Sequence, residues 1–177
     1  MLKNSIPNLL TLTNLSLGVI SIVETFNNNY FYAAILIVLA AIIDRYDGRI
    51  ARFLNVSNNL GKELDSLADL VSFGVAPALL IFVKYYFFHL EYMGIVGIVI
   101  PLLYTISGCY RLAKYNLSEF DGVFTGIPIT ISGVIISLFT LIAPNNDIFI
   151  TLSLMLLSLF TFLMISKLKI KKYNSKH

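Results

Sequence analysis

Long apolar runs separated by short polar breaks make up most of this chain. Each run approaches the ~20 residues that a helix needs to cross the hydrocarbon core of a bilayer. Two of the breaks are the asparagines at 27–29 and the Pro-Asn-Asn sequence at 144–146, residues that favour turns. The pattern predicts six helices, at 8–26, 30–53, 61–87, 93–114, 125–143 and 147–166. We therefore expect an all-α membrane protein with six transmembrane helices.

The composition agrees with this expectation. Of the 177 residues, 57% are hydrophobic and 13% are charged, whereas soluble domains carry about 25% charged residues. Six spans would use roughly 120 residues and leave only short loops. We expect one integral membrane domain over 1–177 with a basic tail from about 167, and partners that include membrane lipids but no nucleic acid. The single Cys109 excludes an internal disulfide, and a zinc site would need more Cys and His than the chain has.

The distribution of positive charge predicts the orientation in the membrane. Cytoplasmic loops carry an excess of Lys and Arg. With the predicted helices, twelve of the 13 cationic residues fall on one side, namely Lys3, Arg45, Arg49, Arg52, Lys62, Arg111, Lys114 and the lysines at 167, 169, 171, 172 and 176. Lys84 is the exception. We expect both termini to face the cytoplasm and the protein to lie in the cell membrane.

Four aspartates lie where the second and third predicted helices meet. Asp44 and Asp47 are three residues apart, and Asp65 and Asp69 are four apart; both spacings put side chains on one face of a helix. The connection at 54–60 is short, so the two helices should be antiparallel neighbours. All four carboxylates can then converge on one small volume near the cytoplasmic surface.

Carboxylates at such a place need a compensating partner, because one at a helix centre costs roughly 2.5–3.5 kcal/mol on insertion scales. Hard divalent cations take oxygen ligands. Gly48, Ala51 and Gly61 leave room for close approach of a ligand or another helix, and Arg52 has a planar fork suited to phosphate. A lone aspartate pair could equally be a salt bridge or part of an ion pathway. The whole set favours metal ions and a phosphate-bearing ligand.

The fixed residues follow the pattern Asp44-x2-Asp47-Gly48-x2-Ala51-Arg52-x8-Gly61-x3-Asp65-x3-Asp69. This pattern resembles the signature of the CDP-alcohol phosphotransferases at every specified position. Members of that family are six-helix membrane enzymes, usually homodimers. They move a substituted phosphate from a CDP-linked donor to an alcohol and release CMP. The resemblance implies the same fold and reaction type for this chain.

The resemblance also implies roles for individual residues. Asp44, Asp47, Asp65 and Asp69 would bind two Mg²⁺ or Mn²⁺ ions, and Asp69 would be the base that takes the proton from the acceptor hydroxyl. Pro7-Asn8-x2-Thr11 resembles a stretch that many members use to hold the nucleotide; several members have Arg three residues further on, where this chain has Asn14. The residues implied to contact the CDP-lipid are Asn8, Thr11, Gly48, Ala51, Arg52, Gly61 and either Ser57 or Asn58.

Three stretches, at 63–78, 111–116 and 124–128, are similar to the phosphatidylserine synthases within this family. They imply transfer from CDP-diacylglycerol or CDP-archaeol to L-serine. Arg111 could hold the serine carboxylate in a bidentate geometry, with Lys114 and Asn116 beside it. Anchoring at the membrane surface is the alternative for both cations, more for Lys114 than for Arg111, and Asn116 could simply end its helix.

Other functions stay open at this point. Glycerol 3-phosphate or inositol phosphate could be the acceptor, although both would favour a more cationic pocket than Arg111 and Lys114 offer. A divalent-cation transporter would explain the aspartates, but not Gly48, Ala51, Arg52 and Gly61 at these intervals. A degenerate scaffold member would not need the complete pattern. Within the enzyme hypothesis we favour direct displacement, because the pattern offers a base and metal ligands but no further nucleophile.

Overall fold

The computed structural model describes residues 2–53, 59–86, 94–117, 123–166 and 169–171. Its helices are α1 (Leu2–Phe26), α2 (Tyr30–Phe53), α3 (Asn59–Asp69), α4 (Ala76–Ile81), α6 (Val96–Leu117), α7 (Ile129–Ile142) and α8 (Asp147–Ile165), with π-helical segments η1 (Leu70–Val75) and η2 (Phe82–Tyr86) on either side of α4. Segments α3, η1, α4 and η2 follow one another without a break. Within the described residues, each of the six predicted helices therefore corresponds to one helical stretch.

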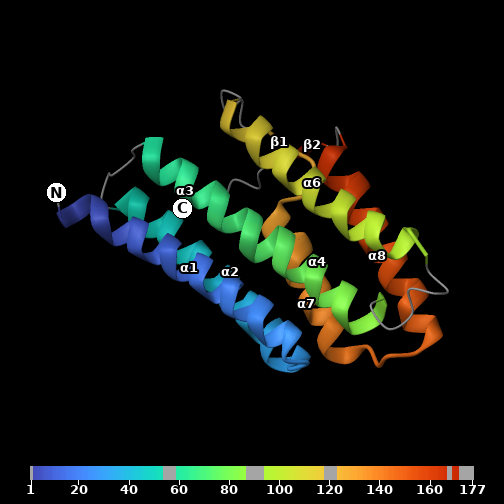
Figure 1. Ribbon diagram of the computed structural model, residues 1–177. Helices are drawn as coiled ribbons and strands as arrows, with labels where there is room; N and C mark the ends of the chain where they lie inside the picture. The colour runs from blue at the N-terminus through green and yellow to red at the C-terminus, as the bar shows by residue number, and fades with distance from the viewer. Residues whose placement is uncertain (1, 54–58, 87–93, 118–122, 167–168, 172–177) are drawn as a thin grey trace.

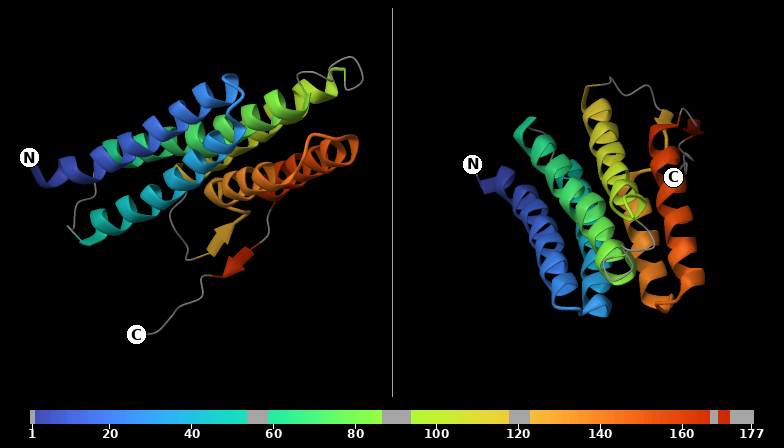
Figure 2. Two further views of the ribbon diagram at one scale, coloured as in Figure 1. Left: turned by 90° about the horizontal axis from the view of Figure 1, so that it is seen from below. Right: turned by 45° about the vertical axis from the view of Figure 1, so that its right-hand side comes forward.

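The stretch from α3 to η2 forms the centre of the bundle. Figure 1 shows it between α1 and α2 on one side and α6, α7 and α8 on the other, and both outer groups pack against it. Its apolar window is 56% buried, against 28% in α1, α6 and α8. Figure 2 shows the long helices packed side by side with their axes roughly aligned. The residues of α3 are thus held by neighbours on both sides.

Four described helical stretches are long and apolar enough to cross a membrane. They are Pro7–Phe26, Asn59–Tyr86, Val96–Leu117 and Asp147–Ile165, while Ile129–Ile142 is apolar but shorter. Helix α2 is not among them because its last three turns carry the charged residues from Asp44 to Arg52. Many large apolar side chains on the outer faces are exposed, as on α1 and α8. Soluble monomers rarely expose apolar surface on this scale, so the chain is a membrane protein.

The prediction for 125–143 was wrong at its start, and the described part of the basic tail forms a strand. Val123–Thr125 forms strand β1, which pairs antiparallel with β2 at Lys169–Lys171. Gly126 then adopts a left-handed φ of 74°, and a Cβ there would lie 2.5 Å from the Met164 carbonyl oxygen. Pro128 is the N-cap of α7. The glycine turn and the proline delay the helix by four residues, a boundary that apolar periodicity does not register.

The π-helical segment η1 follows directly after Asp69, the last residue of α3. Pro77 has no N–H to offer to the carbonyl of Phe73 four residues earlier, and the Tyr104 hydroxyl of α6 donates to that carbonyl at 2.8 Å. Tyr104 also lies 3.1 Å from the Ser132 hydroxyl of α7. The irregular turn is therefore fixed by two neighbouring helices.

Lys84, the exception to the charge asymmetry, has a structural explanation. Its Nζ donates to the carbonyl oxygens of Thr140 at 2.6 Å and Ala143 at 2.9 Å, and the Tyr85 hydroxyl also donates to Ala143. A cation at a helix C-terminus satisfies free carbonyls and opposes the negative end of the helix dipole. Lys84 thus caps α7, which explains a cation on this side of the bundle.

Helix α1 approaches the central stretch most closely at Gly18. A Cβ on Gly18 would lie 2.8 Å from Ser72 Cα and would overlap the Ser72 hydroxyl. We predict that Gly18→Ala lowers the thermal unfolding temperature in detergent, because overpacking, typically ~1–3 kcal/mol, outweighs the ~0.5–1 kcal/mol that Ala gains in a helix.

Gly48→Ala is the matched control, because a Cβ at Gly48 would meet no atom of the described residues within 4 Å, apart from its own helix turn. Its unfolding temperature should be equal to or above that of the unchanged protein. Equal unfolding temperatures for the two variants would contradict the close α1–η1 packing.

Candidate functional site

Helices α2 and α3 bring three carboxylates together where the second and third helical stretches meet. Asp44 and Asp47 lie one turn apart on α2, and Asp65 lies on α3. One carboxylate oxygen from each lies within 4.8 Å of the other two. Asp47 is only 5% exposed, and Asp44 and Asp65 are half-buried. The convergence that the residue spacing predicts is thus present in the fold.

Asp69 lies one turn further along α3 and deeper in the bundle. It is 9% exposed, and its carboxyl group is in hydrogen-bonding contact with that of Asp44. The Asn14 side chain of α1 donates from Nδ2 to Asp69 Oδ1 at 3.4 Å, longer than the usual 2.7–3.2 Å. Asp69 is therefore beside the three-aspartate cluster but is contacted from a third helix.

Helix α1 supplies polar contacts that we did not predict. The Thr11 hydroxyl lies 3.1 Å from Asp47 Oδ2 and also 3.1 Å from the Pro7 carbonyl oxygen, so its one proton is shared between them or alternates. The Ser72 hydroxyl donates to the Asn14 carbonyl at 3.0 Å. Thr11, Asn14 and Gly18 recur on one face of α1, which marks that face in the sequence but does not identify the residues it contacts.

The donor set suits a hard divalent cation. Carboxylate oxygens are the ligands that Mg²⁺ and Mn²⁺ prefer, and three of them already face one another within reach of one ion. Like charges this close repel strongly at low dielectric, so the cluster is stabilised by any cation that enters it. The residues present therefore fit a metal site formed by Asp44, Asp47 and Asp65, with Asp69 adjacent.

The residues predicted to contact a nucleotide lie partly around this cluster. Asn8 is half-buried on α1, three residues before Thr11. A Cβ added at Gly48 would meet no neighbouring element among the described residues, so a ligand could approach the backbone beside Asp47. Ala51 and Arg52 lie on the last turn of α2 and Gly61 on the first turn of α3. The side chains of Ala51 and Arg52, and all of Ser57 and Asn58, are outside the described residues.

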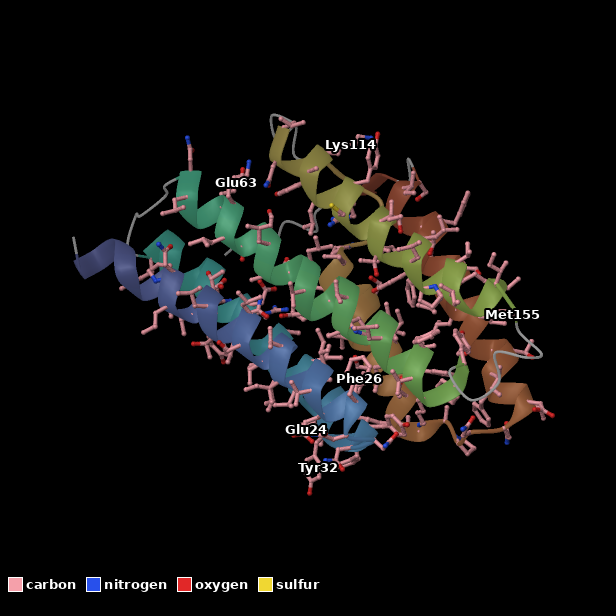
Figure 3. The ribbon with its side chains drawn as sticks, in the orientation of Figure 1. Glu24, Phe26, Tyr32, Glu63, Lys114 and Met155 are labelled. Atoms are coloured by element: carbon pink, nitrogen blue, oxygen red, sulfur yellow. The ribbon has the colours of Figure 1, made fainter. Side chains whose placement is uncertain are left out.

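The predicted acceptor residues differ in their surroundings. Arg111 of α6 is partly buried and attracted to the charge of Asp69, and its Nε has no hydrogen-bond partner among the described residues. Asn116 donates to the Ser66 hydroxyl at 2.9 Å and so ties the end of α6 to α3. Lys114 is exposed and lies at the same end of the molecule as Glu63, opposite Glu24 and Tyr32 (Figure 3). Of the three, Arg111 is the one whose charge is influenced by an aspartate, namely Asp69.

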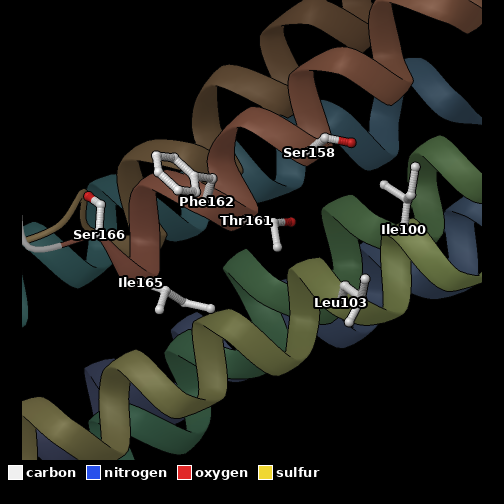
Figure 4. A pocket seen from close by; sticks show the side chains of 7 residues that line it. All are labelled: Ile100, Leu103, Ser158, Thr161, Phe162, Ile165 and Ser166. Atoms are coloured by element: carbon white, nitrogen blue, oxygen red, sulfur yellow. The ribbon is translucent and has the colours of Figure 1, made fainter.

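A separate groove of about 370 Å³ lies between α6 and α8 (Figure 4). Its lining is mainly apolar and consists of Ile100, Leu103, Ser158, Thr161, Phe162, Ile165 and Ser166. The hydroxyls of Thr161 and Ser166 already donate to carbonyls of their own helix. The groove contains none of the predicted site residues.

Comparisons with known proteins identify the family of this chain. The family profile described as CDP-alcohol phosphatidyltransferase matches residues 4–165. The CDP-diacylglycerol–serine O-phosphatidyltransferase of Bacillus subtilis is 34% identical over 98% of this chain and 93% of its own length. The Helicobacter pylori protein of the same name is 38% identical over 77% of this chain. The archaetidylserine synthase of Methanothermobacter thermautotrophicus is 36% identical over 77% of this chain.

The matches to the Helicobacter and archaeal relatives cover 57% and 58% of those longer proteins. The profile match nevertheless includes all four aspartates and the helices that carry them. The spacing of the aspartates, their convergence in the fold and the extent of the match lead to one conclusion: the chain belongs to the CDP-alcohol phosphatidyltransferase family.

Proposed function

We propose that this chain is a metal-dependent transferase that moves a phosphatidyl or archaetidyl group from a CDP-lipid to the hydroxyl of L-serine and releases CMP. The observation that carries the proposal is the convergence of Asp44, Asp47 and Asp65, with Asp69 in contact beside them. Carboxylates gathered at membrane depth are costly unless they bind a cation, and a pyrophosphate donor is a ligand that such a site serves well.

Serine as acceptor is supported by the names of the relatives and by the charges near Asp69. Three relatives from bacteria and an archaeon are named for serine transfer. Arg111 supplies one partly buried guanidinium close to Asp69, which suits the single carboxylate of an amino acid. Lys114 and Asn116 would border the opening through which serine reaches Asp69. Phosphate-bearing acceptors such as glycerol 3-phosphate or inositol phosphate carry more negative charge and would call for further cations.

The chain's own residues account for the main parts of the reaction. Asp44, Asp47, Asp65 and Asp69 would hold two Mg²⁺ or Mn²⁺ ions, which when bound neutralise the pyrophosphate and the charge that develops on the leaving CMP. Asn8, Thr11, Gly48, Ala51, Arg52, Gly61 and one of Ser57 and Asn58 would border the nucleotide. Arg111 would orient serine so that its hydroxyl faces Asp69.

Asp69 would act as general base. Its carboxylate accepts the proton of the serine hydroxyl, directly or through one water, while the serine oxygen forms a bond to the lipid-side phosphorus and the bond to CMP breaks. The burial of Asp69 limits competition from bulk water for this proton. In this direct displacement every bond formed and broken is accounted for, and no covalent enzyme intermediate is needed.

The proposal extends to the setting of the reaction. Donor and product are both lipids, so a site at the cytoplasmic face of the cell membrane avoids extracting either one. The distribution of Lys and Arg supports this orientation, with both termini inside. We further propose a homodimer of single catalytic domains spanning 1–177, each with a basic tail from about 167. The donor carries either acyl or isoprenoid chains.

A transporter for divalent cations is the competing function, and the acidic cluster alone would suit it equally. We predict that purified protein releases CMP from CDP-diacylglycerol or CDP-archaeol only when serine and Mg²⁺ or Mn²⁺ are both present, and forms a serine phospholipid in equal amount. The measurement is nucleotide release with parallel lipid analysis. CMP formed with glycerol 3-phosphate or inositol phosphate instead would overturn the acceptor, and metal flux in vesicles without CMP would support the transporter.

Replacing the proposed base gives a second prediction. Asp69→Asn should lower the turnover number by about 10²–10⁴-fold, because an amide cannot accept the proton, while binding of CDP-lipid remains measurable. Asp147→Asn, an exposed carboxylate on the first turn of α8, is the matched control and should keep full turnover. A steady turnover by Asp69→Asn within about tenfold of the unchanged protein would rule out Asp69 as the base.

A further inference from the structure

Asn14 is a buried polar residue that the proposed reaction leaves without a role. It lies in the middle of α1 and is fully buried, at 0% exposure. Its Oδ1 has no hydrogen-bond partner in the described part of the chain. A buried acceptor without a partner destabilises a fold, so a leucine of similar size would be expected here if packing were the only requirement.

The other side of the Asn14 amide faces Asp69. Its Nδ2 lies 3.4 Å from Asp69 Oδ1, and hydrogen bonds in active sites are often this long before substrate binds. Among the contacts of Asp69 with the described residues, it is the one that offers a neutral N–H donor. The Asp44 contact joins two acids, and Arg111 acts through charge. An N–H directed at one oxygen fixes which lone pairs of Asp69 remain available.

The helical stretch that carries Asp69 also contacts the backbone of Asn14 on α1. Ser72, three residues after Asp69, donates its hydroxyl to the Asn14 carbonyl at 3.0 Å. Gly18, one turn further along α1, allows the backbones to approach, since a Cβ there would lie 2.8 Å from Ser72 Cα. The contacts of Ser72 and Gly18 thus fix the position of the Asn14 amide relative to Asp69.

From this geometry we propose that Asn14 is a positioning residue for Asp69. It holds Oδ1 of the carboxylate from α1 and leaves Oδ2 directed toward the acceptor hydroxyl and the metal cluster. This inference rests on the proposed function for its catalytic part. Thr11 contacts Asp47 in the same way one turn earlier, so α1 orients one aspartate on each of the two neighbouring helices.

The test compares Asn14→Leu with Ser21→Ala. Leucine keeps the volume but removes the N–H, so turnover number should fall by about 10- to 100-fold. The KM for the CDP-lipid should stay within about twofold and the unfolding temperature should not fall, because the partnerless Oδ1 is also removed. Ser21 is also fully buried on α1 and bonds to the Ala33 carbonyl at 2.8 Å, away from the aspartates. Ser21→Ala should lower the unfolding temperature and leave turnover unchanged.

A double-mutant cycle separates positioning from packing and needs no turnover. Mn²⁺ affinity, read by electron paramagnetic resonance, should weaken several-fold in Asn14→Leu but should not weaken further when Asn14→Leu is added to Asp69→Asn. Asn14→Ala, which removes the N–H and adds no charge, replaces the leucine variant if that one does not fold.

Three results would overturn the inference: unchanged turnover in Asn14→Leu, a loss of Mn²⁺ affinity that adds fully to that of Asp69→Asn, or a parallel fall of unfolding temperature and activity. If the unchanged protein releases no CMP, the proposed function fails. The cycle of Mn²⁺ affinities then decides the role of Asn14 by itself.

Discussion

Mutual repulsion among four buried or half-buried carboxylates is the constraint on which the rest of this structure depends. Asp44, Asp47 and Asp65 have oxygens within 4.8 Å of one another, and Asp69 touches Asp44. In a low-dielectric bundle such a cluster opposes folding. It persists because α2 and α3 are fixed by packing elsewhere, and a bound divalent cation would turn the repulsion into attraction. Because bringing these charges together raises the free energy of the fold, we infer that they form a metal site.

The surrounding helices hold this cluster in place from several directions. Thr11 and Asn14 reach two of the aspartates from α1, and Arg111 of α6 is attracted to the charge of Asp69. Beyond Asp69, the π-helical turn is tied to α6 and α7 through Tyr104, and at the end of the same stretch Lys84 caps α7. The helix that carries Asp65 and Asp69 is therefore fixed along its length, which a site needing exact carboxylate positions requires.

Features that depend on residues near one another in the sequence could be predicted, whereas contacts between distant residues could not. Helix positions and the convergence of the aspartates follow from apolar runs and from spacings of three and four residues, because both report a face of one helix. The contacts of Thr11 with Asp47 and of Asn14 with Asp69 join residues 36 and 55 positions apart, and no local pattern encodes such pairs. The strand pair at Val123–Thr125 and Lys169–Lys171 also depends on distant pairing, and the late start of α7 depends on a left-handed Gly126. The role of Lys84 required the position of α7 to be known.

The central claim is that the aspartates of α2 and α3 bind divalent metal in order to act on a pyrophosphate. The most direct measurement is an anomalous-scattering map of crystals grown with Mn²⁺ and a CDP-lipid. We expect manganese peaks within coordination distance of carboxylate oxygens of Asp44, Asp47 and Asp65, next to the diphosphate. Manganese elsewhere, or a diphosphate bound while these carboxylates pair with Lys or Arg side chains, would contradict it.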